Sequence, residues 1–253
     1  MKIRIKFAKY GVMKFIGHLD VMRFFQKAIR RADIDIRYSE GFSPHPVMSF
    51  AAPLGVGMES LGEYLDIDVN SITTLEDMKN ALNHEMTEGI SILSVNLLPD
   101  TEQNAMASVA AARYLVLPSS GWKNGQNADR ALGFPIDRIE ERLAAFYARE
   151  RILVIKKNKK GERELDLKPG IFELQVEEIP HPVAADGKLY QAVSMLVDAS
   201  SSGNIKPTLV FQAFCADCGV LPEVCTHQII RMDTLKNLAK EGEERRFVPL
   251  DFC

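Results

Sequence analysis

Long apolar runs are missing from this 253-residue sequence. No stretch approaches the ~20 consecutive apolar residues that a membrane-spanning helix needs. Residues 1–6 alternate charged with apolar side chains, so they do not form the apolar core of a signal peptide. We therefore expect a cytoplasmic protein with no membrane as a partner.

Several common cofactor motifs are also missing. The sequence contains no P-loop, no GxGxxG loop, no HExxH helix and no CxxxCxxC cradle for a radical-type iron–sulfur cluster. We therefore expect no bound cofactor. Because no catalytic motif is complete, the sequence favours a protein that is not itself an enzyme.

Cysteine is scarce and confined to the C-terminal part of the chain, at positions 215, 218, 225 and 253. This pattern does not fit a disulfide framework, so we expect reduced thiols. Cys215, Cys218, Cys225 and His227 have spacings that could hold zinc. The stronger interpretation is structural, because a helix over 210–220 would place Cys215 and Cys218 one turn apart on its apolar side. We expect no metal.

Charge is unevenly distributed along the chain. The formal net charge is −3, but residues 1–50 contain ten Lys or Arg and four Asp or Glu, which gives them +6 and leaves −9 for the remainder. A basic patch of this kind is the electrostatic footprint of a phosphate-bearing partner. A solvated charged face is the commoner origin of such a pattern.

The spacing of apolar residues predicts an α+β protein with two tandem ferredoxin-like (βαββαβ) modules, of which the second is more divergent. We place the first module at residues 1–99, the second at 109–240 and a charged tail at 241–253. Within the first module we expect helices at 18–32 and 73–85, and strands at 2–10, 34–38, 47–51, 63–69 and 90–98. Within the second we expect helices at 135–149 and 207–220, and strands at 113–117, 152–157, 164–167, 172–178, 190–198 and 227–232.

Two features of the first module are candidates for RNA binding. On the predicted helix, Arg23, Lys27, Arg30 and Arg31 fall within an arc of about 100°, opposite the apolar side chains. The following loop, from Arg37 to Pro46, holds Tyr38, Phe42 and Ser43 and the proline-framed His45. Phosphates would be held by Arg23, Lys27, Arg30, Arg31 and Arg37, and bases or ribose would be contacted by Phe42 and His45. Tyr38 and Ser43 are further candidate RNA-binding residues. Lysines of the N-terminal strand could extend this surface.

Proton transfer is the alternative use of the same region. Imidazole as a group is suited to proton transfer, which makes His18 and His45 the natural candidates, and Asp20 or Glu40 could orient a ring. The competing hypothesis is therefore a metal-independent RNA-processing or RNA-modifying enzyme with His18 and His45 as acid and base. A histidine at a helix start can equally satisfy backbone amides or pack on a neighbour.

A succession of short motifs resembles the radical S-adenosylmethionine (radical SAM)-associated family of uncharacterised bacterial proteins. The resemblance is dense over residues 1–70 and thins later, where Lys168 replaces an arginine of the family pattern. The motifs are Gly17-His18-Leu19-Asp20, Arg30-Arg31-Ala32, Tyr38 to Pro46, Ser49-Phe50, Pro53-Leu54, Gly57-x-Glu59-Ser60, Glu63-Tyr64-Leu65-Asp66, Glu164 to Pro169 and Arg231-Met232-Asp233.

This resemblance implies a partner enzyme, a radical SAM protein that in some cases binds cobalamin, and RNA as the molecule being handled. The first hypothesis is thus an RNA-binding accessory protein that works with a radical SAM enzyme in RNA modification. A third hypothesis is a protein-interaction module that binds the radical SAM enzyme without contacting RNA. The tandem ferredoxin-like interpretation is also similar in topology to CRISPR RNA-processing proteins, although the glycine-rich loop typical of those proteins is missing.

Overall fold

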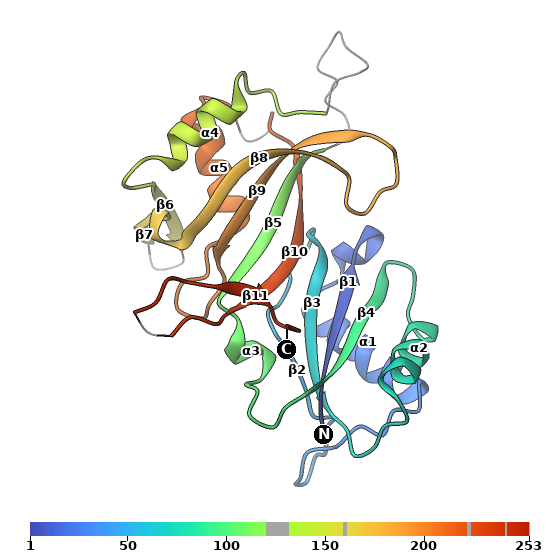
Figure 1. Cartoon of the computed structure of the whole chain (residues 1–253). Helices are drawn as coiled ribbons and strands as arrows, with labels where there is room; N and C mark the ends of the chain where they lie inside the picture. The colour runs from blue at the N-terminus through green and yellow to red at the C-terminus, as the bar shows by residue number, and fades with distance from the viewer. Residues whose placement is uncertain (120–131, 159–160, 222–223, 241, 253) are drawn as a thin grey trace. The chain divides into compact units, whose positions relative to one another are not determined.

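The computed structural model describes residues 1–253 except 120–131, 159–160, 222–223, 241 and 253 (Figure 1). The chain forms two compact units. The first comprises residues 1–110 and 231–253, and the second comprises residues 111–230. Each unit contains mostly antiparallel β-sheet and a few helices, so the α+β prediction agrees with the structure at this level.

The first unit is built on the strand order β4-β1-β3-β10, with β2 also pairing with β3 and β11 with β10. The pairs β1–β3, β1–β4, β2–β3 and β10–β11 are all antiparallel. The elements are β1 (Lys2–Lys9), the 3-10 helix η1 (Gly11–Phe15), α1 (His18–Arg31), β2 (Met48–Phe50), β3 (Glu59–Asp68), α2 (Leu75–His84), β4 (Ile90–Leu98), α3 (Ala105–Ser108), β10 (His227–Asn237) and β11 (Phe247–Pro249).

Helices α1 and α2 cover one face of this sheet (Figure 1). Ile3, Ile5 and Phe7 alternate along β1 and pack against Phe25 of α1 and Leu82 of α2. Alternation with a period of two places these β1 residues on one face, while the 3.6-residue period of α1 turns its apolar stripe toward them. The predicted helix at 18–32 is therefore confirmed to within one residue, and its apolar stripe is buried.

The opposite face of β1 differs from the expectation of an exposed basic strand. Arg4 is fully buried, and its guanidinium donates to Asp66, to Leu250 O and to Gln103 O. Residues near positions 103 and 250 are far from β1 in sequence and cover it in the fold. The structure thereby assigns residues 231–253 to the first unit, whereas the sequence placed 231–240 in the second module and 241–253 in a separate tail.

The second unit has the strand order β5-β9-β8, in which both pairs are antiparallel, and a separate two-stranded sheet, β6-β7. Its helices are α4 and α5, and Phe134 and Phe146 pack on Phe211 and Phe214 of α5. The elements are β5 (Ala111–Pro118), α4 (Ile139–Tyr147), β6 (Leu153–Asn158), β7 (Gly161–Asp166), the 3-10 helix η2 (Lys168–Gly170), β8 (Ile171–Pro180), β9 (Leu189–Asp198) and α5 (Pro207–Asp217). Among the described residues, no helix is both long enough and apolar enough to span a membrane.

Candidate functional site

Residues 37–47 form a short hairpin, here called the aromatic hairpin. Tyr38 bridges Pro46, and Val47 N donates to Arg37 O at 2.9 Å. Ser39 closes the hairpin, because Ser39 N donates to His45 O at 2.9 Å and His45 N donates to Ser39 Oγ at 3.1 Å. The predicted strand at 34–38 is thus reduced to isolated bridges, but the loop that follows it is closed by hydrogen bonds between Ser39 and His45.

The tip of the aromatic hairpin presents its side chains to solvent. Phe42 is fully exposed, and Tyr38 is 49% exposed. Ser43 and His45 are also exposed. The Nδ1 atom of His45 lies 2.9 Å from Ser39 Oγ. The hairpin therefore brings together Phe42 and His45, the predicted base or ribose contacts, with Tyr38 and Ser43, the two further RNA-binding candidates.

The basic face of α1 is exposed, as the helical period predicts, but carboxylates reduce its charge. Arg23 lies 3.6 Å from Asp20, and Arg31 Nε donates to Glu85 Oε2 at 2.5 Å. The Arg31 hydrogen bond is the first cause that lowers the pKa of Glu85.

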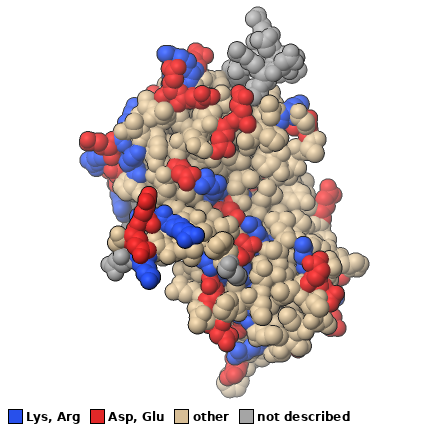
Figure 2. Space-filling view, in the orientation of Figure 1, with Lys and Arg blue, Asp and Glu red and all other residues tan. Residues whose placement is uncertain are grey.

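Arg37, at the base of the hairpin, lies 3.8 Å from Asp68. Lys27 and Arg30 have no ion pair within the part of the chain that the structure describes. On the face shown in Figure 2, basic and acidic side chains are interspersed. Because carboxylates lie beside Arg23, Arg31 and Arg37, the cationic surface is smaller than the sequence predicts, and Lys27 and Arg30 carry most of its charge.

The lysines of β1 do not add to this surface. Lys6 Nζ donates to Asp233 Oδ2 at 2.7 Å, and Lys9 is only 2% exposed. With Arg4 buried against Asp66, the expectation that the N-terminal strand extends an RNA surface is wrong. The physical reason is that acidic residues distant in sequence pair with Arg4 and Lys6, and that Lys9 is buried.

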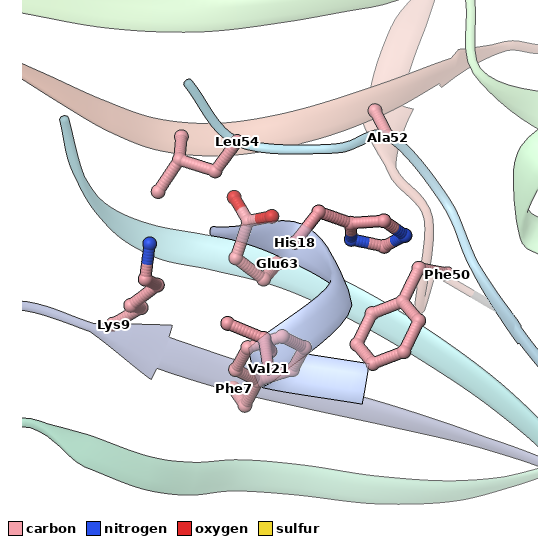
Figure 3. Close-up of a pocket in the computed structure, with 8 residues that line it drawn as sticks. All are labelled: Phe7, Lys9, His18, Val21, Phe50, Ala52, Leu54 and Glu63. Atoms are coloured by element: carbon pink, nitrogen blue, oxygen red, sulfur yellow. The ribbon is translucent and has the colours of Figure 1, made fainter. Parts of the chain in front are cut away.

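Lys9 instead lines a pocket in the first unit, together with His18 and Glu63 (Figure 3). The pocket has about 270 Å³ of empty space, part of it open to solvent. Lys9 ends β1, His18 begins α1 and Glu63 lies in β3, so three elements bring charged or titratable groups to one place. The remaining lining residues are Phe7, Val21, Phe50, Ala52 and Leu54.

Charged groups of the pocket are held by long-range contacts. Glu63 Oε1 lies 3.2 Å from Arg231 Nη1 and forms an ion pair with it. The angle between these groups does not allow a hydrogen bond to Glu63 Oε1. Arg231 in turn donates to Ala52 O and Pro53 O, both at 3.2 Å. Lys9 Nζ donates to Ile16 O at 3.0 Å. Burial lowers the pKa of Lys9, and Glu63 opposes this effect.

His18 and His45 are not brought together. The His18 ring meets Phe50 edge-on, with 5.1 Å between ring centroids, whereas His45 bonds within the hairpin. Residues 45–50 are extended, and an extended chain rises ~3.3 Å per residue, so His45 lies roughly 16 Å along the chain from Phe50, the residue that the His18 ring contacts. The two imidazoles therefore do not form one acid–base pair in this structure.

The cysteines lie in the second unit. Cys215 and Cys225 are both buried, and burial followed by their mutual contact raises the pKa of Cys215. Cys218 is half-buried, and the His227 ring packs on Phe211. Among the described residues, no group of three or more His, Cys, Asp or Glu side chains is placed to hold a metal. Cys253 lies outside the described residues.

Sequence reasoning missed Lys9, Glu63 and Arg231 as members of one site. The sequence did contain a sign of this site, because residues two apart in a strand point to the same face. Lys9 follows the apolar Phe7 by two positions and Glu63 precedes the apolar Leu65 by two, so both charged residues share a face with apolar ones. Glu63 and Arg231 also fall in motifs that carry the family resemblance, as do His18, Phe50 and Leu54. These separate motifs thus contribute to one pocket.

A family model described as "Uncharacterized protein conserved in bacteria (DUF2344)" matches residues 2–207. The chain belongs to this family. No curated protein matches the chain. Membership supports the part of the sequence prediction that concerned an uncharacterised bacterial family. All eight residues that line the pocket lie within the matched range.

Three solved structures are similar over most of their length. A protein described as unknown from Galdieria sulphuraria is 14% identical, with 92% of this chain and 98% of that chain covered and a TM-score of 0.23. A CRISPR associated protein Cas6 is 9% identical, with 92% and 99% covered and a TM-score of 0.24. The encapsulated DyP-type peroxidase from Mycobacterium smegmatis is 10% identical, with 92% and 90% covered and a TM-score of 0.20. TM-scores this low do not establish a common fold, so these likenesses assign neither fold nor function.

Proposed function

We propose that this protein is an RNA-binding accessory protein that works with a radical SAM enzyme in RNA modification. The observation that carries the RNA-binding part is the full exposure of Phe42 at the tip of a hydrogen-bonded hairpin. The partner enzyme and the modification reaction rest on the family resemblance alone.

An exposed aromatic ring on an ordered turn suits an unpaired nucleotide. Every base has a π-face, so Phe42 can stack on it without reading sequence. Burying such a ring in the protein core would stabilise the fold, whereas here the ring makes no such contribution and is available to a ligand. Arg37 at the hairpin base and Lys27 and Arg30 on α1 supply charge for phosphates.

Fluorescence anisotropy with a labelled single-stranded RNA tests this proposal. Stacking of one base is worth about 1–3 kcal/mol, so Phe42→Ala should weaken binding by roughly 5- to 150-fold, while Phe42→Tyr should preserve it. Phe15→Ala is the matched control, because Phe15 is also an exposed phenylalanine of the first unit. Equal affinities for wild type and Phe42→Ala would reject the stacking role.

Salt dependence provides an independent measure of the phosphate contacts. Each contact to a single strand contributes a slope of about −0.7 to the logarithm of affinity against the logarithm of salt concentration. Three contacts, from Lys27, Arg30 and Arg37, predict a slope of about −2.1, and Lys27→Ala should reduce its magnitude by ~0.7. A slope near zero in the wild type would contradict phosphate binding by α1.

Docking of the hairpin on a protein is the outcome that competes with RNA. A pull-down of the radical SAM enzyme after nuclease treatment separates the two. If Phe42→Ala abolishes capture of the enzyme and leaves RNA affinity unchanged, the hairpin is a protein-docking element and the RNA proposal fails.

We also propose that residues 1–99 form a ferredoxin-like module. Support comes from the antiparallel order β4-β1-β3 with β2 on β3, and from two helices that follow β1 and β3 in the chain. Expression of residues 1–99 alone tests the limits of the module. Because Arg4 bonds to residues beyond this range, we expect the fragment to be less stable than the first unit of the full chain.

A further inference from the structure

Ser39 and His45 face each other across the aromatic hairpin and hold each other by several hydrogen bonds. Ser39 Oγ accepts from His45 N at 3.1 Å and lies 2.9 Å from His45 Nδ1. The backbone adds a further bond, because Ser39 N donates to His45 O at 2.9 Å. The exposed imidazole ring is therefore held through Nδ1, while its Nε2 atom has no hydrogen-bond partner among the described residues.

The Ser39 hydroxyl can serve both of its contacts at once. A hydroxyl group has one proton to donate and two lone pairs that accept. Because a lone pair of Ser39 Oγ already accepts the His45 N–H, the hydroxyl proton is available to Nδ1, and the two bonds strengthen each other. This arrangement leaves Nδ1 without a proton, so a neutral ring carries its proton on Nε2.

The opposite tautomer fits the hairpin less well. With the proton on Nδ1, the ring would donate to Ser39 Oγ and to Ser43 O. The distance to Ser43 O is 3.4 Å, beyond the usual range of about 2.7–3.2 Å for such a bond. Ser39 Oγ would then accept two bonds, and its own proton would have no acceptor among the described residues.

We propose that Ser39 fixes His45 as the Nε2–H tautomer, so that His45 donates a hydrogen bond from Nε2 to an oxygen acceptor of the RNA. This inference rests on the proposed RNA binding by the aromatic hairpin. The acceptor is a base carbonyl or a phosphodiester oxygen. Ser39 is thus a positioning residue for the contact that His45 makes. Because Nε2 of this tautomer already carries a proton, His45 does not act there as a general base.

Long-range ¹H–¹⁵N NMR of the full chain tests the tautomer directly, because protonated and unprotonated ring nitrogens have well-separated ¹⁵N shifts. Two other histidines serve as internal standards. His181 Nδ1 accepts from two backbone amides and so has no proton, whereas His227 Nδ1 lies 2.8 Å from Cys225 O and so carries one. At about pH 8.5, where free imidazole is neutral, the His45 pattern should match that of His181. A match to His227 would overturn the proposal.

Fluorescence anisotropy with labelled hexauridylate measures what the Nε2–H donor contributes. His45→Ala should weaken binding about 2- to 12-fold, which corresponds to the loss of one net hydrogen bond. His84→Ala is the matched control, because His84 is an exposed histidine of the same unit, and it should leave the affinity unchanged. Equal affinities of wild type and His45→Ala for hexauridylate would refute the donor role.

An abasic RNA of the same length locates the acceptor. If the acceptor is a phosphodiester oxygen, His45→Ala weakens binding of the abasic RNA as well. If it is a base carbonyl, His45→Ala weakens binding of hexauridylate alone. Either result supports a hydrogen bond from His45 to the RNA.

A double-variant cycle tests whether Ser39 acts through His45. Ser39→Ala should weaken binding to hexauridylate, Ser39→Thr should restore it because the hydroxyl is kept, and Ser39→Ala should have no further effect once His45 is replaced by alanine. Ser39 Oγ also accepts from the backbone of residue 45, so a purely structural Ser39 would weaken binding in both backgrounds, and this result would refute the positioning role.

Failure of this inference is distinguishable from failure of the proposed function. If Phe42→Ala weakens binding and His45→Ala does not, RNA binding by the hairpin stands and the role of His45 fails. If the wild type has no affinity for RNA, both fail.

Discussion

Removal of the Asp66 carboxylate should be among the most destabilising single substitutions in the first unit. Arg4 is fully buried, and its Nε and Nη2 atoms donate to Asp66 at 2.8 and 2.9 Å. In Asp66→Ala the guanidinium would keep its bonds to Leu250 O and Gln103 O and the Glu102 carboxylate at 3.6 Å, but it would lose its principal, hydrogen-bonded counter-charge. Ala105 N, which donates to Asp66 Oδ2 at 2.7 Å, would lose its acceptor as well.

The expected cost follows from the burial of the pair. Breaking a buried ion pair by removing one partner destabilises a protein by about 3–5 kcal/mol, because the remaining charge is uncompensated. Replacing both partners with apolar side chains is often neutral, so Arg4→Met combined with Asp66→Ala should recover at least half of the loss. The residual cost reflects the carbonyl groups and the amide that lose their partners.

Urea unfolding followed by far-UV circular dichroism measures the free energy of unfolding. Hydrogen exchange at amides of β1 and β3 reports the first unit by itself, which matters because the chain forms two compact units. Glu173→Ala is the matched control, since its pair with Arg113 is exposed and should be worth ~0.2–1 kcal/mol. A loss below about 1 kcal/mol in Asp66→Ala, or a double variant no more stable than the single one, would refute the reasoning.

Three further substitutions or measurements test local features of the fold. Gly62→Ala should destabilise the first unit, because a Cβ there would lie 2.3 Å from the backbone of Asp233; thermal unfolding should show a lowered Tm, and an unchanged Tm would contradict this close approach. Thr74→Ala should cost about 1 kcal/mol in urea unfolding, since Thr74 Oγ1 accepts from Asp77 N at the start of α2, whereas Thr74→Ser should cost little. Burial raises the pKa of Cys215, so its thiol should stay protonated at pH 8 and react with iodoacetamide far more slowly in the native protein than in urea; equal rates by mass spectrometry would contradict this.

Local periodicity was sufficient to predict α1 and its two faces. Val21, Phe25 and Ile29 recur at helical spacing and are buried in the structure, while Arg23 and Lys27 on the other side are exposed. Such patterns depend only on residues within one element, so they can be read from a single sequence. The exposed position of Phe42 follows similarly from the glycine and prolines that surround it.

Pairing between distant residues was not predictable in this way. The charge of the α1 face depends on Glu85, and that of the hairpin depends on Asp68, which lies in a different strand. Neither carboxylate is adjacent in sequence to the arginine it contacts. Counting charges over residues 1–50 therefore overestimated the cationic surface, because the neutralising acids lie outside that window.

Charged residues at core positions of strands indicate polar sites inside the fold, which a count of charges along the sequence does not show. Lys9 and Glu63 each continue the apolar phase of their strand, and the antiparallel register places Glu63 opposite Phe7, two residues from Lys9. A lysine or glutamate in such a position must be paired or must face a cavity, because its burial is otherwise too costly. Two such residues on neighbouring strands therefore predict a polar site inside the fold. In this protein the two residues line one pocket together with His18.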